Sequence, residues 1–289
     1  MGIWDEIKSS FKSGSALTKL IYINLAVFIV VKLLGVFTTI LQLDYKVTPI
    51  FWLSVTADIS TLIYKPWTIL TYMFVHRDFL HILFNLLWFF WFGQIFLRYF
   101  SEKKLISVYL LGGLSGAALY ILAFNAFSIY NPETPMIGAS ASVIAVVVAI
   151  SFYIPNHTMN LMFIGPVKLK YIALISIVMD VLSITSLNAG GHIAHLGGAF
   201  FGYLYIMQFK KGRNITKGFD RFMDKLFSIF KPRTKFKVTH KRPMTDYEYN
   251  RTKATKQEDI DAILDKIAKS GYDSLSKQEK DTLFKNSKR

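Results

Sequence analysis

Long apolar runs, separated by short polar or Gly- and Pro-containing segments, dominate the first 208 residues of the chain. A run of about 20 apolar residues suits a helix that crosses the hydrocarbon core of a bilayer, and shorter runs can cross within a bundle. The runs and their punctuation predict six membrane-spanning helices at 20–43, 79–97, 105–124, 137–154, 169–184 and 193–209. The pattern therefore predicts an all-α polytopic membrane protein.

A different pattern follows residue 209. Residues 215–230 place apolar side chains at helical spacing with Lys and Arg on the opposite side, which is typical of a helix on an anionic membrane surface. Two capping-box sequences, Thr255-x-x-Glu258 and Ser276-x-x-Glu279, predict two helix starts on either side of Gly271. The predicted organisation is a cytosolic N-terminal segment (1–19), a six-helix core (20–208), a basic amphipathic juxtamembrane helix with a linker (209–245) and a cytosolic helical hairpin (246–289).

The charge distribution predicts how the core is oriented. The net charge is +15, and 22 of the 34 Lys and Arg residues follow residue 208. Lys and Arg also follow the second and fourth apolar runs, whereas 125–136 and 185–191 contain none. Since Lys and Arg accumulate on the cytoplasmic side, both termini are expected to be cytoplasmic. A basic tail beside membrane helices is explained by the bilayer surface, so no nucleic-acid partner is expected.

Few polar side chains lie inside the apolar runs, and such residues are candidates for function. His81 and Asn85 are four residues apart and share one helix face, while Ser140 opens the fourth run and His195 lies near the start of the sixth. The loop charges place all four at similar depth in the outer half of the bundle. A serine with a base and with donors for an oxyanion can carry out acyl transfer. The residue types also suit plain helix packing or an interhelical hydrogen bond, so the spacing alone leaves both interpretations open.

Three stretches resemble motifs of the rhomboid family of intramembrane serine proteases, in the order of that family and over roughly residues 20–208. They are His76-Arg77-Asp78-Phe79-Leu80-His81-Ile82-Leu83-Phe84-Asn85, Gly138-Ala139-Ser140-Ala141, and Ala194-His195-Leu196-Gly197-Gly198 with Gly202. The resemblance implies a six-helix bundle around a water-filled cavity open to the outside.

The resemblance also implies a role for each matching residue. Ser140 would be the nucleophile and His195 its general base, in a dyad that needs no Asp partner. The oxyanion would be held by His81, Asn85 and the backbone N–H of Ser140. Gly138, Gly198 and Gly202 would allow close helix packing at the site, as the spacing Gly198-x-x-x-Gly202 also indicates.

Three positions depart from the family pattern. Ala141 stands where many members have Gly, and Thr68 follows Trp67 where the family has a Trp-Arg pair in its first outer loop. Ile144 stands where many members have a Tyr that stacks on the histidine of the dyad, so the resemblance does not extend to the orientation of His195.

The function that follows is a rhomboid serine endopeptidase that cleaves transmembrane segments of single-pass membrane proteins through an acyl-enzyme. The expected location is a cell membrane, the bacterial inner membrane for a chain of this type. One alternative is a catalytically inactive rhomboid-like protein that binds or traffics membrane proteins, and another is a small transporter using Lys32 and Asp180. We interpret Lys32 as a side chain that snorkels or faces a cavity and Asp180 as hydrogen-bonded near the cavity mouth.

No cofactor or metal ion is expected. The chain has no Cys, and its histidines are dispersed along the sequence without evident carboxylate partners. His192 lies three residues before His195, but the Ala-His-x-x-Gly context favours His195 as the base.

Overall fold

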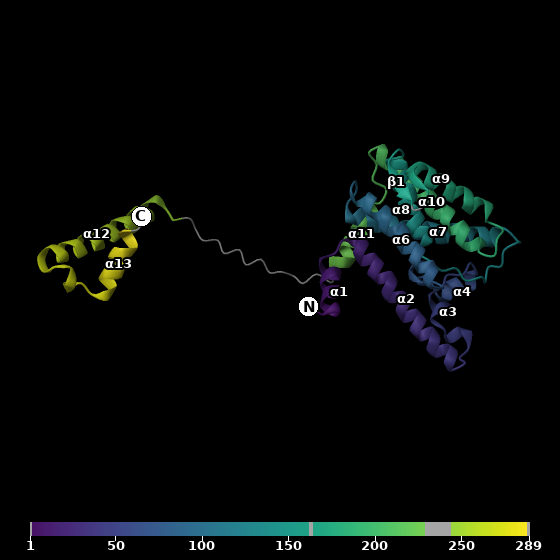
Figure 1. Cartoon of the computed structure of the whole chain (residues 1–289), viewed down its shortest axis with the longest axis horizontal. Helices are drawn as coiled ribbons and strands as arrows, with labels where there is room; N and C mark the ends of the chain where they lie inside the picture. Colours follow the sequence, from purple (N-terminus) through teal and green to yellow (C-terminus); the bar gives the residue numbers. More distant parts are fainter. Residues whose placement is uncertain (1, 162–163, 229–243, 288–289) are drawn as a thin grey trace. The chain divides into compact units, whose positions relative to one another are not determined.

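The computed structural model describes residues 2–161, 164–228 and 244–287 (Figure 1). The chain forms two compact units, Met1–Lys231 and Pro232–Arg289. In the first unit, each of the six predicted apolar runs forms one helix. These helices are α2 (Ala16–Ile40), α6 (Phe79–Leu97), α7 (Glu102–Ala126), α8 (Ser140–Tyr153), α9 (Leu169–Leu182) and α10 (Ala189–Lys210).

Three of these helices, α2, α6 and α7, are long and apolar enough to cross a membrane by themselves. Most of α2 is exposed, with large apolar side chains along its length, as expected for a helix that faces lipid. It starts at Ala16, four residues before the predicted run, because the Ser15 side chain caps it by accepting the N–H of Thr18. The prediction of a helical membrane protein with several spans is thus confirmed, with three crossings assigned by length and composition.

Helix α8 lies at the centre of the bundle, buried along most of its length and in contact with α6, α7, α9 and α10. With 14 residues it is about 21 Å long, which is shorter than the roughly 30 Å hydrocarbon core. Its neighbours therefore have to enclose it. This arrangement places the start of α8 inside the bundle rather than at its edge.

Glycines bring α8 and α10 into backbone contact. A Cβ added at Gly198 would lie 2.1 Å from the carbonyl oxygen of Ala141, and one at Gly202 would lie 2.3 Å from that of Ala145. The close approach expected from the Gly198-x-x-x-Gly202 spacing is confirmed. From α7, Gly116 leaves room for the Ala141 methyl group, since a Cβ at Gly116 would lie 2.7 Å from it. The bundle thus has room for Ala141, at the position where the family pattern has Gly.

Buried hydrogen bonds connect the other helices. The Asn24 amide of α2 donates to the Tyr109 hydroxyl of α7 at 3.2 Å, and that hydroxyl donates to the Met73 carbonyl at 3.3 Å. Between α7 and α10, the Ser115 hydroxyl donates to the Gly197 carbonyl at 2.8 Å. These bonds satisfy polar groups that would otherwise be costly in an apolar interior.

The long connection between α2 and α6 is folded into short helices. They are η1 (Tyr45–Val47), α3 (Pro49–Leu53), α4 (Ile59–Tyr64), α5 (Thr68–Thr71) and η2 (Tyr72–Phe74). The Lys65 ammonium donates to the Phe51 carbonyl at 2.7 Å and lies 3.5 Å from the centre of the Phe51 ring. The Lys65 side chain thus has its partners within this connection. Thr68 is buried, with its hydroxyl donating to the Lys65 carbonyl at 2.7 Å.

A β-hairpin follows α8, a small addition to the all-α fold that the sequence does not predict. Strands β1 (Thr158–Leu161) and β2 (Gly165–Lys168) pair antiparallel, and the hairpin leads directly into α9. Strands of four residues carry too few alternating positions to be recognised from sequence.

Helix α11 (Lys217–Ser228) lies within the predicted juxtamembrane helix at 215–230 and contacts α7. Its Asp220 carboxylate accepts from the Lys104 ammonium and the Ser107 hydroxyl, both at 2.6 Å. Burial raises the pKa of Asp220, but these hydrogen bonds outweigh burial and hold the pKa below its usual value. The polar side of this helix therefore includes a docking contact as well as exposed basic residues. Residues 229–243, which include most of the predicted linker, lie outside the described part of the chain.

The second unit is a helical hairpin of α12 (Asp246–Ser270) and α13 (Lys277–Ser287), joined through η3 (Tyr272–Ser274). The Ser276–Glu279 capping box is confirmed by both of its hydrogen bonds. The one predicted at Thr255 is wrong: Thr255 lies within α12, its hydroxyl donates to the Arg251 carbonyl, and the capping box that starts this helix is Thr245 with Glu248. Both sequences fit the same four-residue pattern, and only the length of the helix distinguishes them.

Adding a methyl group at Gly198 tests the contact between α8 and α10. We expect Gly198→Ala to destabilise the bundle by about 1–3 kcal/mol, because the new Cβ would overlap a backbone carbonyl that cannot rotate away. The matched control is Gly35→Ala in α2, where an added Cβ meets nothing within 4 Å. Thermal unfolding in detergent should show a lower Tm for Gly198→Ala only, and equal Tm values for the two variants would contradict this packing.

Candidate active site

Ser140 is the first residue of α8, and the segment before it is held by the connection between α2 and α6. Val55 and Met136 exchange backbone hydrogen bonds, and the Gly138 N–H donates to the Tyr72 carbonyl at 2.9 Å. Gly138 has φ +129°, a conformation that other residues rarely adopt. Because Ser140 opens a helix, its backbone N–H has no partner within that helix and points away from it.

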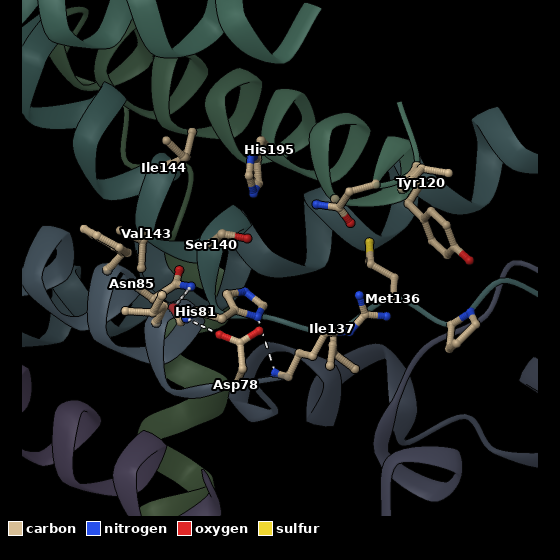
Figure 2. A pocket seen from close by; sticks show the side chains of 18 of the residues that line it. Asp78, His81, Asn85, Tyr120, Met136, Ile137, Ser140, Val143, Ile144 and His195 are labelled. Carbon is tan, nitrogen blue, oxygen red and sulfur yellow. Dashed lines mark hydrogen bonds between the residues drawn. The ribbon is translucent and has the colours of Figure 1, made fainter. Parts of the chain in front are cut away.

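One cavity of about 680 Å³ brings together the four side chains that the sequence singles out. His81 and Asn85 reach it from α6, Ser140 from α8 and His195 from α10 (Figure 2). The wall also contains apolar side chains, among them Trp88 and Ile144. The cavity thus combines an apolar surface with a few convergent polar groups, which is typical of a binding or catalytic site.

Ser140 and His195 face each other across this cavity. In Figure 2 a ring nitrogen of His195 points toward the Ser140 hydroxyl, with His81 on the other side of that hydroxyl. The two side chains, both within the described residues, form no direct hydrogen bond. General-base contacts commonly tighten only when substrate is bound.

The hydrogen bonds of His81 define which of its nitrogens carries the proton. Its Nδ1 accepts the Arg77 N–H in a long bond of 3.4 Å, and its own backbone N–H donates to Asp78, the N-cap of α6, at 2.8 Å. A neutral imidazole whose Nδ1 accepts carries its hydrogen on Nε2. A Cβ at Gly138 would lie 2.9 Å from this Nε2 and 3.5 Å from the Ser140 hydroxyl oxygen. The His81 donor and the Ser140 hydroxyl therefore border the same small space beside Gly138.

Asn85 lies one turn further along α6. Its side-chain amide donates one hydrogen to the His81 carbonyl at 2.8 Å, which fixes the amide and leaves its second hydrogen available. Together with the His81 Nε2–H and the Ser140 backbone N–H, this makes three donors around one part of the cavity. Such a set can stabilise a negatively charged oxygen.

The sequence interpretation missed the partner of His195. The Nδ1 of His195 donates to the Asp180 carboxylate at 2.8 Å, and the Nδ1 of His192 donates to the same oxygen at 2.9 Å. The expectation that the histidines lack carboxylate partners is therefore wrong for this pair. The available signal was Asp180 itself, an ionisable residue inside an apolar run. The sequence does not show which side chain Asp180 faces.

Asp180, His192 and His195 are also the group that could hold a metal ion in the described part of the chain, since their ligand atoms lie within 4.8 Å of one another. Two hydrogen bonds to one carboxylate oxygen account for this spacing without an ion. Lys32, which the transporter alternative pairs with Asp180, lines a separate cavity of about 460 Å³ between α2 and the loop after it. The two charges therefore do not share a site.

Ile144 lines the cavity and packs on a small apolar cluster that includes Val148, Ala173 and Ala199. The one ring partner of His195 among the described residues is His192, edge-on with centroids 5.8 Å apart. The orientation of His195 thus depends on its hydrogen bond rather than on a stacked aromatic ring.

A comparison with protein-family models matches residues 64–211 to the Rhomboid domain, a range that contains every residue of the cavity named above. The chain belongs to the rhomboid family. This rhomboid is 31% identical over 158 residues to "RHOMBOID-like protein 12, mitochondrial" of Arabidopsis thaliana. The match covers 50% of this chain and 47% of the plant protein, so the chain spans about half the length of that relative. Residues 245–289 match a family of unknown function (DUF6576).

Replacing Gly138 should disturb the site and the fold together. We expect Gly138→Ala to lower the free energy of unfolding by at least about 1 kcal/mol, because its φ is unfavourable for alanine and the new Cβ would press on the His81 ring. Gly218→Ala on α11, where an added Cβ meets nothing within 4 Å, is the control. Chemical or thermal unfolding in detergent measures both, and a Gly138→Ala variant as stable as the wild type would contradict the strained turn.

Proposed function

We propose that this rhomboid is an intramembrane serine endopeptidase that cleaves transmembrane segments of single-pass membrane proteins. The observation that carries the proposal is the convergence of the Ser140 hydroxyl, the His195 imidazole and the donors of α6 in one cavity. These groups supply a nucleophile, a base and an oxyanion site, which are the parts that peptide-bond hydrolysis by a serine requires.

In the proposed reaction, the Ser140 hydroxyl oxygen attacks the carbonyl carbon of a peptide bond while neutral His195 takes the hydroxyl proton. The C–N bond then breaks, and the protonated His195 gives its proton to the departing amine. The acyl group remains on Ser140 as an ester. Water, deprotonated by His195, attacks this ester and releases the carboxylic product and the free serine.

Negative charge develops on the carbonyl oxygen in both tetrahedral steps. We assign its stabilisation to His81 Nε2–H, Asn85 and the backbone N–H of Ser140. Gly138, Gly198 and Gly202 contribute by packing, since they allow His81 and α10 to approach the start of α8. No cofactor takes part in this scheme.

The proposed setting is a lipid bilayer, with both termini on the cytoplasmic side because Lys and Arg are concentrated in the tail and in alternate loops. The bacterial inner membrane stays a prediction, since the plant relative is named as mitochondrial.

A catalytically inactive rhomboid-like protein that binds membrane segments is the second candidate. The missing hydrogen bond between Ser140 and His195 and the "rhomboid-like" name of the relative favour it. The two candidates differ in one property, turnover of a membrane substrate.

Ser140→Ala should abolish cleavage of a single-span substrate reconstituted in liposomes, because no other hydroxyl occupies the position of the nucleophile. Ser142→Ala is the matched control: Ser142 lies two residues further along α8, is fully buried, and contacts Met73 rather than the cavity. Gel or mass-spectrometric detection of the two fragments measures cleavage. Fragments formed by Ser140→Ala at the wild-type rate would contradict the proposal.

Asn85→Ala should lower kcat by about 10²-fold and leave KM nearly unchanged, because the amide is assigned to an oxygen that becomes charged only during the reaction. Its present hydrogen bond is within α6, so the fold should be kept. Steady-state cleavage rates over a range of substrate densities separate kcat from KM. A variant that raised KM alone would instead indicate a role in substrate binding.

A further inference from the structure

The Asp180 carboxylate is a buried charge near the end of α9 and needs a structural or functional reason. Its side chain is buried, and it is the one buried residue of α9 that is not apolar. A carboxylate in such a place is costly unless it is paired. In the part of the chain that the structure describes, its partners are two imidazoles of α10, and no Lys or Arg forms an ion pair with it.

We propose that Asp180 is a positioning residue that holds His195 in the orientation and the tautomer that a general base for Ser140 requires. This inference rests on the function proposed above. Asp180 touches neither Ser140 nor the cavity wall, and it acts through His195.

The tautomer follows from the hydrogen bond. A carboxylate oxygen can only accept, so the His195 nitrogen at 2.8 Å from it, Nδ1, carries the hydrogen. In the neutral ring the lone pair is then on Nε2, the nitrogen on the far side from Asp180. This is the nitrogen that has to accept the Ser140 proton. The opposite tautomer would present an N–H to the serine and could not act as a base.

The ring orientation follows from the way the carboxylate is held. Oδ1 accepts from His192 at 2.9 Å as well as from His195, and these histidines lie three residues apart on the same face of α10. Two bonds from one rigid helix fix the position of this oxygen, and the oxygen in turn fixes the rotation of the His195 ring.

The charge of Asp180 also has an effect during the reaction. When Nε2 takes the serine proton, His195 becomes an imidazolium beside a carboxylate that keeps its own charge. In a surrounding of low dielectric constant this attraction stabilises the charged intermediate more than the neutral ground state. Asp180 would therefore raise kcat and leave substrate binding almost unaffected.

The test compares Asp180→Asn with Ser176→Ala. Ser176 lies one turn before Asp180 on α9, and its hydroxyl donates only to the Ile172 carbonyl of the same helix. We expect Asp180→Asn to lower kcat by about 10²-fold with KM within about twofold of wild type, and Ser176→Ala to change neither. Wild-type kcat in a folded Asp180→Asn protein would overturn the proposal. A wild-type chain that cleaves no membrane substrate would instead overturn the proposed function.

A second measurement needs neither activity nor a variant of Asp180. Nitrogen chemical shifts of ¹⁵N-histidine-labelled wild-type protein, with His195 assigned by its absence from a His195→Gln sample, report which ring nitrogen carries the hydrogen. We expect a protonated Nδ1 and an unprotonated Nε2 at neutral pH. A neutral His195 with its hydrogen on Nε2 would overturn the proposal even if Asp180→Asn fails to fold.

Discussion

The backbone contact between α8 and α10 is the constraint on which the site depends. Gly198 lies against the Ala141 carbonyl. Ala141 directly follows Ser140 on α8, and Gly198 lies three residues after His195 on α10. A side chain at this contact would overlap the Ala141 carbonyl, so we expect it to force the helices apart and move the Ser140 hydroxyl away from the His195 imidazole. The same glycine face continues to Gly202, and Gly116 of α7 supports the opposite side of α8. These glycines thus set the distance between the helices that carry the Ser140 hydroxyl and the His195 imidazole.

The remaining parts of the site are oriented by hydrogen bonds rather than by packing alone. Asp78 caps α6 and fixes its first turn, and His81 and Asn85 share bonds within that turn. On the other side, Asp180 fixes His195 from α9. Residues of α6, α7, α8 and α10 line the cavity. Hydrogen bonds limit the rotation of His81, Asn85 and His195.

Much of this architecture follows from the sequence, and the exceptions have physical reasons. Apolar run length predicts all six helices of the core, and the Gly198-x-x-x-Gly202 spacing predicts the close contact. The β-hairpin after α8 is too short to leave a periodic signal. The hydrogen bond between Asp180 and His195 cannot be predicted from the sequence, because it joins two helices whose relative rotation depends on packing. Likewise, Asp220 resembles any other charge of a basic tail, until its bonds to Lys104 and Ser107 place it against α7.

A crystal structure of the protein after reaction with a fluorophosphonate would test the central claim most directly. The account predicts one covalent bond, from phosphorus to the Ser140 hydroxyl oxygen. It also predicts that the phosphonyl oxygen accepts hydrogen bonds from the Ser140 backbone N–H, His81 Nε2 and Asn85, with His195 Nε2 beside the serine oxygen. A reagent bound at another residue, or a phosphonyl oxygen directed away from α6, would contradict the account.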